Sequence, residues 1–156
     1  MNSTANIGSV QHADAELFDV IIIGAGLSGI GAAVRLQRDC PDRTFAVLER
    51  RGAIGGTWDL FRYPGIRSDS DMYTFGYGFK PWNDKSSIAD GHKILRYIRE
   101  AAAEYDVEQH IRYQHKVLSA NWSSTNQRWL VTAELGDTGE QVTIDCQFIF
   151  SCSGYY

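Results

Sequence analysis

The sequence has few cysteines and no long apolar run, and each shortage excludes a class of protein. Its three cysteines, Cys40, Cys146 and Cys152, form no C-x-x-C pair and have no metal-like spacing to a histidine. Because an odd number does not suit a disulfide framework, we expect reduced, buried thiols in a cytoplasmic protein. The N-terminus has no basic segment with a long apolar core, so we expect no signal peptide. The apolar run at residues 20–23 is far too short to span a bilayer.

An excess of positive charge is also missing. The chain carries 15 Lys and Arg against 19 Asp and Glu, a net charge of -4, and its one basic doublet is Arg50-Arg51. This gives no electrostatic footprint for nucleic acid. His92, His110 and His115 have no ligand-like partners, so we predict no metal site. A hydrophobic fraction of 44% and 156 residues suit one ordinary globular domain.

The most informative stretch present is a glycine pattern that follows a strand-like run. Residues 17–23 are apolar almost throughout, as in a buried parallel strand, and lead into G-x-G-x-x-G at Gly24, Gly26 and Gly29. A helical pattern follows until Pro41. Gly24 would allow a sharp turn, Gly26 a close backbone approach to a pyrophosphate, and Gly29 close packing of the helix on the strand. The pattern predicts a dinucleotide site.

A carboxylate at the expected distance strengthens this prediction. A second apolar run, residues 44–48, ends at Glu49, roughly 20 residues past the last glycine. A carboxylate there accepts hydrogen bonds from both ribose hydroxyls but repels a 2′-phosphate, which favours FAD or NAD over NADP. The alternative is an ordinary surface glutamate at a strand end. The two strands and the helix between them predict an α/β, Rossmann-like fold with a parallel sheet and crossover helices.

The middle of the chain combines an irregular segment with one clear helix. Residues 51–84 are rich in glycine and aromatics with little regular period, which indicates either a functional loop or an aromatic-packed structural loop. Residues 90–105 have an apolar stripe at helical spacing, with Asp90 placed to cap the helix.

The last third alternates with a period of two. Residues 113–122, 128–135 and 141–144 predict a three-stranded antiparallel meander, and residues 147–152 a further, buried strand. We expect residues 1–16 to be a disordered leader and residues 17–156 to be a dinucleotide-binding domain that continues beyond this chain.

Two motifs in the irregular segment resemble one enzyme family. Gly55-Gly56-Thr57-Trp58 and Arg62-Tyr63-Pro64-Gly65, with Asp69, are similar to the flavin-dependent Baeyer–Villiger monooxygenases of the flavin-containing monooxygenase superfamily. The longer strings at residues 56–72 and 151–156 resemble the ethionamide-activating subgroup. The resemblance extends from Phe18 to the last residue.

The resemblance implies a tightly bound FAD that NADPH reduces, and dioxygen as the oxidant. The substrate would be a ketone, converted to an ester or lactone, or a compound with a soft sulfur or nitrogen atom, such as a thioether. By position, Glu49 would hold the adenosine ribose, Val117 would contact the adenine through its backbone, and Asp69 would help to orient an active-site arginine. The remaining implied cofactor residues are Gly24, Gly26, Ser28 and Gly29 at the pyrophosphate, Gly56, Thr57, Trp58, Asp59 and Leu60 toward the flavin, and Arg67, Ser68 and Asp69 where flavin and NADP meet.

Several parts of the family pattern are absent from these residues. They contain no second G-x-G-x-x-G for NADPH and no F-x-G-x-x-x-H-x-x-x-W fingerprint. We therefore expect an incomplete FAD-binding domain that is inactive alone. A second hypothesis is a non-catalytic nucleotide-binding fragment that needs a partner segment to fold. An FAD-dependent disulfide reductase is disfavoured, because residues 50–60 contain no cysteine.

Overall fold

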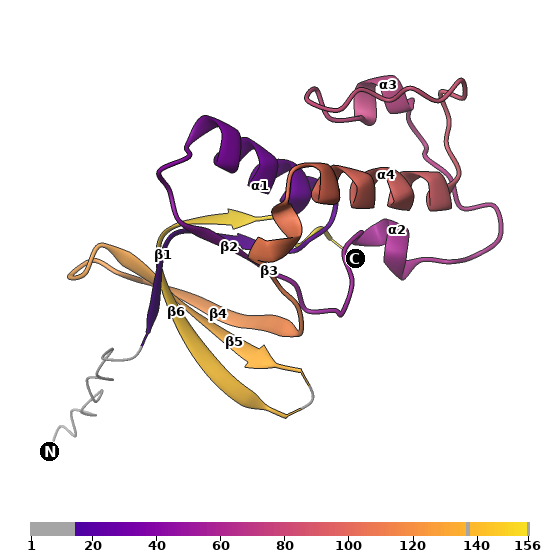
Figure 1. The fold of residues 1–156 in the computed structure, drawn as a ribbon. Coiled ribbons are helices and arrows are strands. Elements are labelled where there is room, and N and C mark those ends of the chain that lie inside the picture. The colour runs from indigo at the N-terminus through magenta and orange to yellow at the C-terminus, as the bar shows by residue number, and fades with distance from the viewer. Residues whose placement is uncertain (1–14, 137, 156) are drawn as a thin grey trace, which may run out of the picture.

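A mixed sheet runs through the whole structure, a computed structural model that describes residues 15–136 and 138–155. Its strand order is β3-β2-β1-β6-β5-β4 (Figure 1). The elements are β1 (Glu16–Ile23), α1 (Leu27–Asp39), β2 (Phe45–Leu48), α2 (Thr57–Leu60), α3 (Met72–Phe75), α4 (Gly91–Glu104), the 3-10 helix η1 (Val107–His110), β3 (Ile111–Arg112), β4 (His115–Ser123), β5 (Arg128–Leu135) and β6 (Glu140–Ser151).

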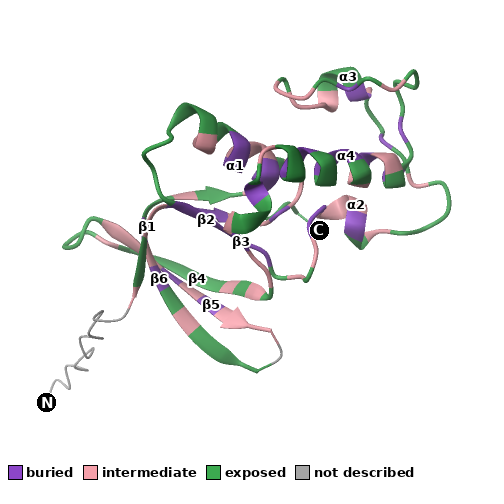
Figure 2. Cartoon of the chain, in the orientation of Figure 1, coloured by how far each residue is buried: buried purple, intermediate pink, exposed green. Residues whose placement is uncertain are grey.

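The parallel half of the sheet confirms the predicted Rossmann-like arrangement. Strand β1 pairs in parallel with β2 on one side and with β6 on the other, and β2 pairs in parallel with β3. Helices α1 and α4 cover one face (Figure 1), with Ile22, Ile30 and Ile98 fully buried between sheet and helices. Figure 2 shows this buried layer on β2 and on the inner sides of both helices. The opposite face has its own core, which includes Ile21 and Ile144.

The antiparallel half confirms the predicted meander but joins it to the parallel half differently. The two strands predicted at residues 141–144 and 147–152 form the single strand β6. Its first part pairs antiparallel with β5, up to Cys146, and its later part pairs in parallel with β1. The prediction that residues 147–152 are buried is wrong, because none of the six is fully buried, and Phe148 and Phe150 are 54% and 44% exposed. Their rings touch each other in an edge-on contact.

The irregular segment contains two short helices, and its second half is structural. Tyr77 stacks on Phe79 and on Tyr97, with ring centroids 4.7 and 5.4 Å apart. The Tyr77 hydroxyl donates a 2.6 Å hydrogen bond to the carbonyl of Leu27 at the start of α1. This part of the segment therefore fits the alternative of an aromatic-packed loop.

Four smaller expectations are revised or left open. Strand β1 begins at Glu16, the last residue of the expected leader, and residues 1–14 lie outside the described part of the chain. Asp90 occupies the N-cap position of α4, but its side chain makes no capping hydrogen bond. Cys40 is exposed, against the expectation of buried thiols. The short strand β3 was not predicted, because two residues carry no period.

Candidate functional site

The carboxyl ends of three parallel strands meet at the glycine turn. The backbone N–H of Gly24 donates to the Leu48 carbonyl at the end of β2, over 2.8 Å. The N–H of Cys152, just after β6, donates to the Ile23 carbonyl at the end of β1, also over 2.8 Å. In open α/β sheets, ligands bind at this edge. The fold thus places the glycine turn at the edge of the sheet where a ligand is expected to bind.

The backbone geometry of the turn requires glycine at positions 24 and 29. Gly24 has a φ of +101°, and a Cβ on it would lie 2.6 Å from the Cys152 carbonyl oxygen. A Cβ on Gly29 would lie 1.8 Å from the Gly24 carbonyl oxygen. The sharp turn and the close helix packing predicted for these two positions are both present.

Gly26 has a different role, because the structure leaves space beside it. Its φ of -81° suits any residue. A Cβ on Gly26 would lie 3.5 Å from Cα of Gly56, and a Cβ on Gly56 would lie 3.0 Å from Cα of Gly26. The two glycine backbones therefore approach each other closely, and the narrow gap between them is one that a single side chain would fill. The gap adjoins the first turn of α1, which has no side-chain cap, so its N–H groups are available to an anion. The residues present fit a pyrophosphate.

Glu49 lies against the same turn. Its side chain is only 7% exposed, so it is not the surface glutamate of the alternative interpretation. The Ala25 N–H donates to Oε2 and the Arg51 N–H donates to Oε1, each over 2.8 Å. These two bonds fix the carboxylate next to the glycines while leaving lone pairs that a ribose hydroxyl can reach. Its role at the ribose remains a prediction.

The start of β4 adjoins Glu49. The His115 N–H donates to the Glu49 carbonyl over 2.9 Å. Val117, two residues further along, is half-buried and pairs with Ala133. This strand is the outermost of the sheet, so one side of its backbone faces away from β5. The structure thus brings Val117 to the same end of the site as Glu49.

The four residues of α2 differ in what they can offer a ligand. Asp59 is 2% exposed and accepts hydrogen bonds from three arginines: Arg51 at 2.5 Å, Arg62 at 3.1 Å and Arg99 at 3.2 Å. Its carboxylate is committed to them, so any contact of Asp59 with a flavin would come from its backbone. Thr57 and Trp58 are half-buried, and Leu60 is exposed.

The residues predicted to lie where flavin and NADP meet, Arg67, Ser68 and Asp69, follow α2 in the sequence. Ser68 is buried, and its Oγ accepts the Ala89 N–H over 3.1 Å. Arg67 pairs with Asp90 through a short antiparallel bridge, and both Arg67 and Asp69 are exposed. Ser28 is exposed on the first turn of α1. The roles of these residues remain predictions.

Sequence reasoning missed the arginines around Asp59. Arg62 follows Asp59 at the i,i+3 spacing of a helical ion pair, a signal that was available. Arg51 and Arg99 come from other segments, and only the fold brings them to Asp59.

Burial makes two of the three thiols poor nucleophiles. Burial raises the pKa of Cys146 to about 11, and burial also raises the pKa of Cys152. Among residues 15–136 and 138–155, no group of His, Cys, Asp and Glu could hold a metal ion. No helix in those ranges is long and apolar enough to cross a membrane.

Comparison with known proteins agrees with this geometry. Residues 22–89 match the family model described as an NAD(P)-binding Rossmann-like domain. The chain is 53% identical to the FAD-containing monooxygenase EthA of Mycobacterium tuberculosis over 141 residues, 90% of this chain and 28% of that protein. It is 56% identical to EthA of Mycolicibacterium smegmatis, with the same coverage. The resemblance predicted from the motifs is confirmed.

Solved structures show the same fold. The chain superposes on an oxidized steroid monooxygenase bound to NADP with a TM-score of 0.77 and 29% identity, covering 88% of this chain and 26% of that one. For OTEMO in complex with FAD and NADP, the TM-score is 0.75 at 34% identity, with the same coverage. The chain thus spans about a quarter of the length of the proteins that it matches.

Proposed function

We propose that this chain is the FAD-binding portion of an NADPH- and dioxygen-dependent flavoprotein monooxygenase. One observation carries the proposal: the gap between Gly26 and Gly56 lies beside the uncapped start of α1, with the buried Glu49 carboxylate on the same turn. Relatives named FAD-containing monooxygenases support the choice of FAD.

Each part of the site would bind a different part of the cofactor. The N–H groups of the first turn of α1 would donate to the diphosphate, whose negative charge the helix dipole also stabilises. Glu49 would accept hydrogen bonds from the ribose hydroxyls, held in place by the Ala25 and Arg51 N–H groups. Val117 would contact the adenine through its backbone. A 2′-phosphate would meet the Glu49 carboxylate, so the site would reject NADP.

The chemistry of the whole protein would come from the flavin. Bound FAD supplies hydride acceptance from NADPH and the activation of dioxygen. This chain's residues would hold and orient it, with Trp58 keeping water from one side. We infer oxidation of a ketone to an ester or lactone, or oxygenation of a thioether or amine. Asp69 would orient an arginine from elsewhere in the protein. The cytoplasm remains the predicted location.

The binding step can be tested on this chain by titration calorimetry. We expect FAD to bind with one-to-one stoichiometry and NADP to bind at least tenfold more weakly. A Glu49→Gln variant should reduce the difference between the affinities for FAD and NADP, because the amide no longer repels a 2′-phosphate. Glu100→Gln, on the exposed side of α4, is the matched control. Equal affinity for FAD and NADP in the unaltered chain would refute the role of Glu49.

The activity can be tested in parallel. We expect no oxygen-dependent NADPH consumption by this chain with a ketone or a thioether, because it contains no second glycine motif for NADPH. Clear turnover would contradict the proposal that the catalytic groups lie elsewhere.

The exposure of Phe148 and Phe150 favours a second candidate: a nucleotide-binding fragment that needs a partner segment to fold. Exposed adjacent apolar side chains often mark a surface that another segment covers. A sharp thermal unfolding transition of the purified chain, together with stoichiometric flavin, would contradict this candidate.

A further inference from the structure

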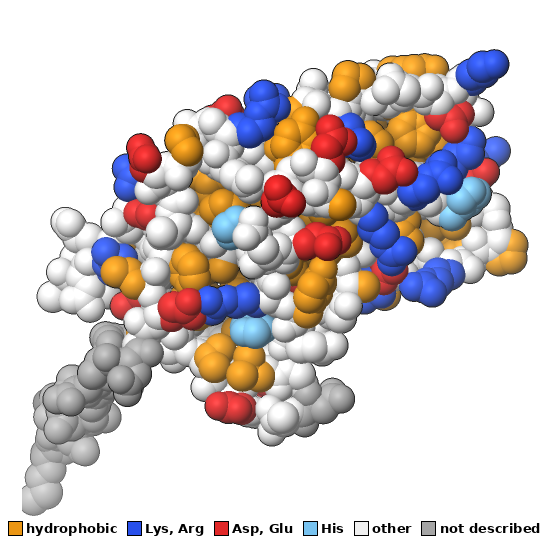
Figure 3. All heavy atoms as spheres, viewed as in Figure 1, with side chains coloured by type: hydrophobic (Ala, Val, Ile, Leu, Met, Phe, Trp, Pro, Cys, Tyr) orange, Lys and Arg blue, Asp and Glu red, His pale blue; other side chains and the backbone are white. Residues whose placement is uncertain are grey.

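A second hollow lies outside the glycine site, between α2, the loop that follows it, and the N-terminal half of α4. Its volume is about 560 Å³, within the range of small-molecule sites. Figure 3 shows Lys and Arg side chains gathered over this end of the molecule. The side chains that matter here are the guanidinium groups of Arg62 and Arg99, the imidazole of His92, and the flat or apolar surfaces of Trp58, Tyr63 and Leu95.

Asp59 holds the two arginines of this groove side by side. Nη2 of Arg62 and Nη2 of Arg99 both donate to the same oxygen, Asp59 Oδ1, over 3.1 and 3.2 Å. Arg62 also donates through Nε to the Asp59 carbonyl over 3.0 Å. Because Asp59 is 2% exposed and comes from a different element than Arg99, the pair is fixed from beneath. Such fixed guanidinium groups lose little freedom when a ligand binds.

The charges around this acid do not balance. Asp59 also accepts from Arg51, so one carboxylate faces three guanidinium groups. Asp59 lies beneath the groove, and the carboxylate that lines the groove itself is Asp90, whose side chain makes no capping bond. Within the described residues, Arg99 makes one hydrogen bond and Arg62 two, both to Asp59. Most of the N–H donors of these two arginines therefore remain available to a ligand.

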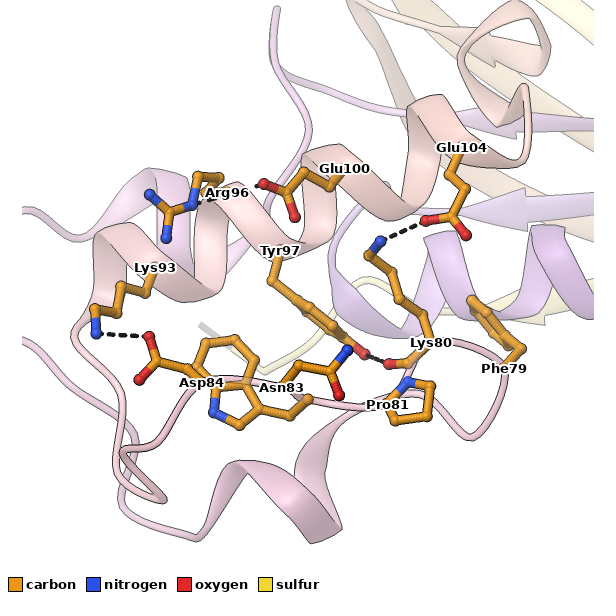
Figure 4. A pocket seen from close by; sticks show the side chains of 11 residues that line it. Phe79, Lys80, Pro81, Asn83, Asp84, Lys93, Arg96, Tyr97, Glu100 and Glu104 are labelled. Atoms are coloured by element: carbon orange, nitrogen blue, oxygen red, sulfur yellow. Dashed lines mark hydrogen bonds and ion pairs between the residues drawn. The ribbon is translucent and has the colours of Figure 1, made fainter.

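A hollow of comparable size, between α4 and the loop at residues 79–84, provides a contrast. There, Lys80 pairs with Glu104, Lys93 with Asp84, and Arg96 with Glu100 (Figure 4). Each cation has an acid of its own, so that hollow has no surplus charge for an anion.

We propose that the groove of Arg62 and Arg99 binds a small-molecule oxyanion, a carboxylate or a phosphate, carried on a flat apolar body. The two guanidinium groups bind the oxyanion with charge-assisted hydrogen bonds. The ring of Tyr63 and the side chain of Leu95, which both line the groove, contact the body. This site is separate from the glycine site and does not depend on the proposed function.

Three probes that share one body test the proposal by titration calorimetry on the whole chain. They are 2-naphthoate, 2-naphthyl phosphate and the neutral 2-naphthamide. We expect at least one of the two anions to bind one-to-one, and the amide to bind at least tenfold more weakly. Their relative affinities show whether the site prefers carboxylate or phosphate. Absence of saturable binding by both anions overturns the proposal.

Two substitutions with opposite expected effects on the affinity for the anion locate the site. Arg99→Gln should weaken the anion about tenfold, whereas Asp90→Asn should strengthen it, because the amide removes the competing negative charge. Arg96→Gln, on the same helix, should leave the affinity unchanged. Since Asn is a good N-cap residue, Asp90→Asn keeps the test valid even if the arginine variant fails to fold. Affinity that responds to neither change overturns the proposal.

One control separates this site from the cofactor site. Gly26→Ala should lower FAD affinity and leave 2-naphthoate affinity unchanged. If both ligands weaken together, the probe binds at the glycine site and the proposal fails. If neither the unaltered chain nor this variant binds FAD while 2-naphthoate binds both, only the proposed function fails.

Discussion

Gly26→Ala should separate cofactor binding from folding. The substitution adds one methyl group between Gly26 and Gly56, where it would touch Cα of Gly56 at 3.5 Å, an ordinary contact. The φ of -81° accepts alanine without strain. Alanine is a poorer N-cap than glycine, so the loss of stability should be about 1 kcal/mol or less.

The loss of binding should be much larger. The methyl group fills the space through which a diphosphate would approach the first turn of α1. If two N–H groups lose their bonds to a charged oxygen, at about 1.5–3 kcal/mol each, the cost is about 3–6 kcal/mol. This corresponds to roughly a 10²- to 10⁴-fold weaker affinity for FAD.

Flavin fluorescence titration and thermal unfolding of the same samples measure both quantities. Gly52→Ala is the matched control, because its Cβ would meet only the end of the Gln114 side chain, at 3.1 Å, away from the gap. We expect this control to bind FAD normally. Unchanged FAD affinity in Gly26→Ala would refute the assignment of the gap to the diphosphate.

Three further predictions concern stability. Gly29→Ala should lower the free energy of unfolding by about 3 kcal/mol, because its Cβ would lie 1.8 Å from the Gly24 carbonyl oxygen and backbone must move; urea denaturation measures this. Asp59→Asn should lower the free energy of unfolding by roughly 3 kcal/mol in the same assay, because three arginines lose a buried counter-charge. A loss below about 0.5 kcal/mol, which is typical of a neutral surface substitution, would contradict this. Burial lowers the pKa of His110 from its ordinary value of 6.5. Between the lowered pKa and 6.5, the unfolded chain binds more protons than the folded chain, so the free energy of unfolding should fall as pH drops through this range. His110→Phe, which keeps the ring contact with Phe45, should flatten the decline in unfolding midpoint between pH 7.5 and 5.

Local signals in the sequence predicted the glycine site well. Few other residues could replace Gly24 and Gly29. Gly24 has a positive φ, and a Cβ on Gly29 would collide with the backbone of Gly24. The spacing of Glu49 depends on one helix and one strand, which the periodicity of the sequence predicts. By contrast, Gly56 reaches Gly26 only because the irregular segment folds back, and no period marks that path.

Features that depend on distant segments escaped prediction. Residues 141–144 and 147–152 appeared to be separate strands because their patterns differ, yet β6 runs through both. It pairs with β5 up to Cys146 and with β1 from Ile144 onward, so residues 144–146 lie between the two strands. One ion pair of Asp59 likewise comes from Arg99, 40 residues away. A charged residue in a loop gives no sign of such partners.

Amide chemical-shift mapping of this chain with FAD tests the proposed cofactor site. We expect saturable shifts at the first turn of α1 and at Ala25, Glu49, Gly56 and Val117. Along the outer strands of the meander beyond Val117, we expect no saturable shifts. Saturable shifts confined to another surface, or none up to the solubility limit of FAD, would contradict the proposed site.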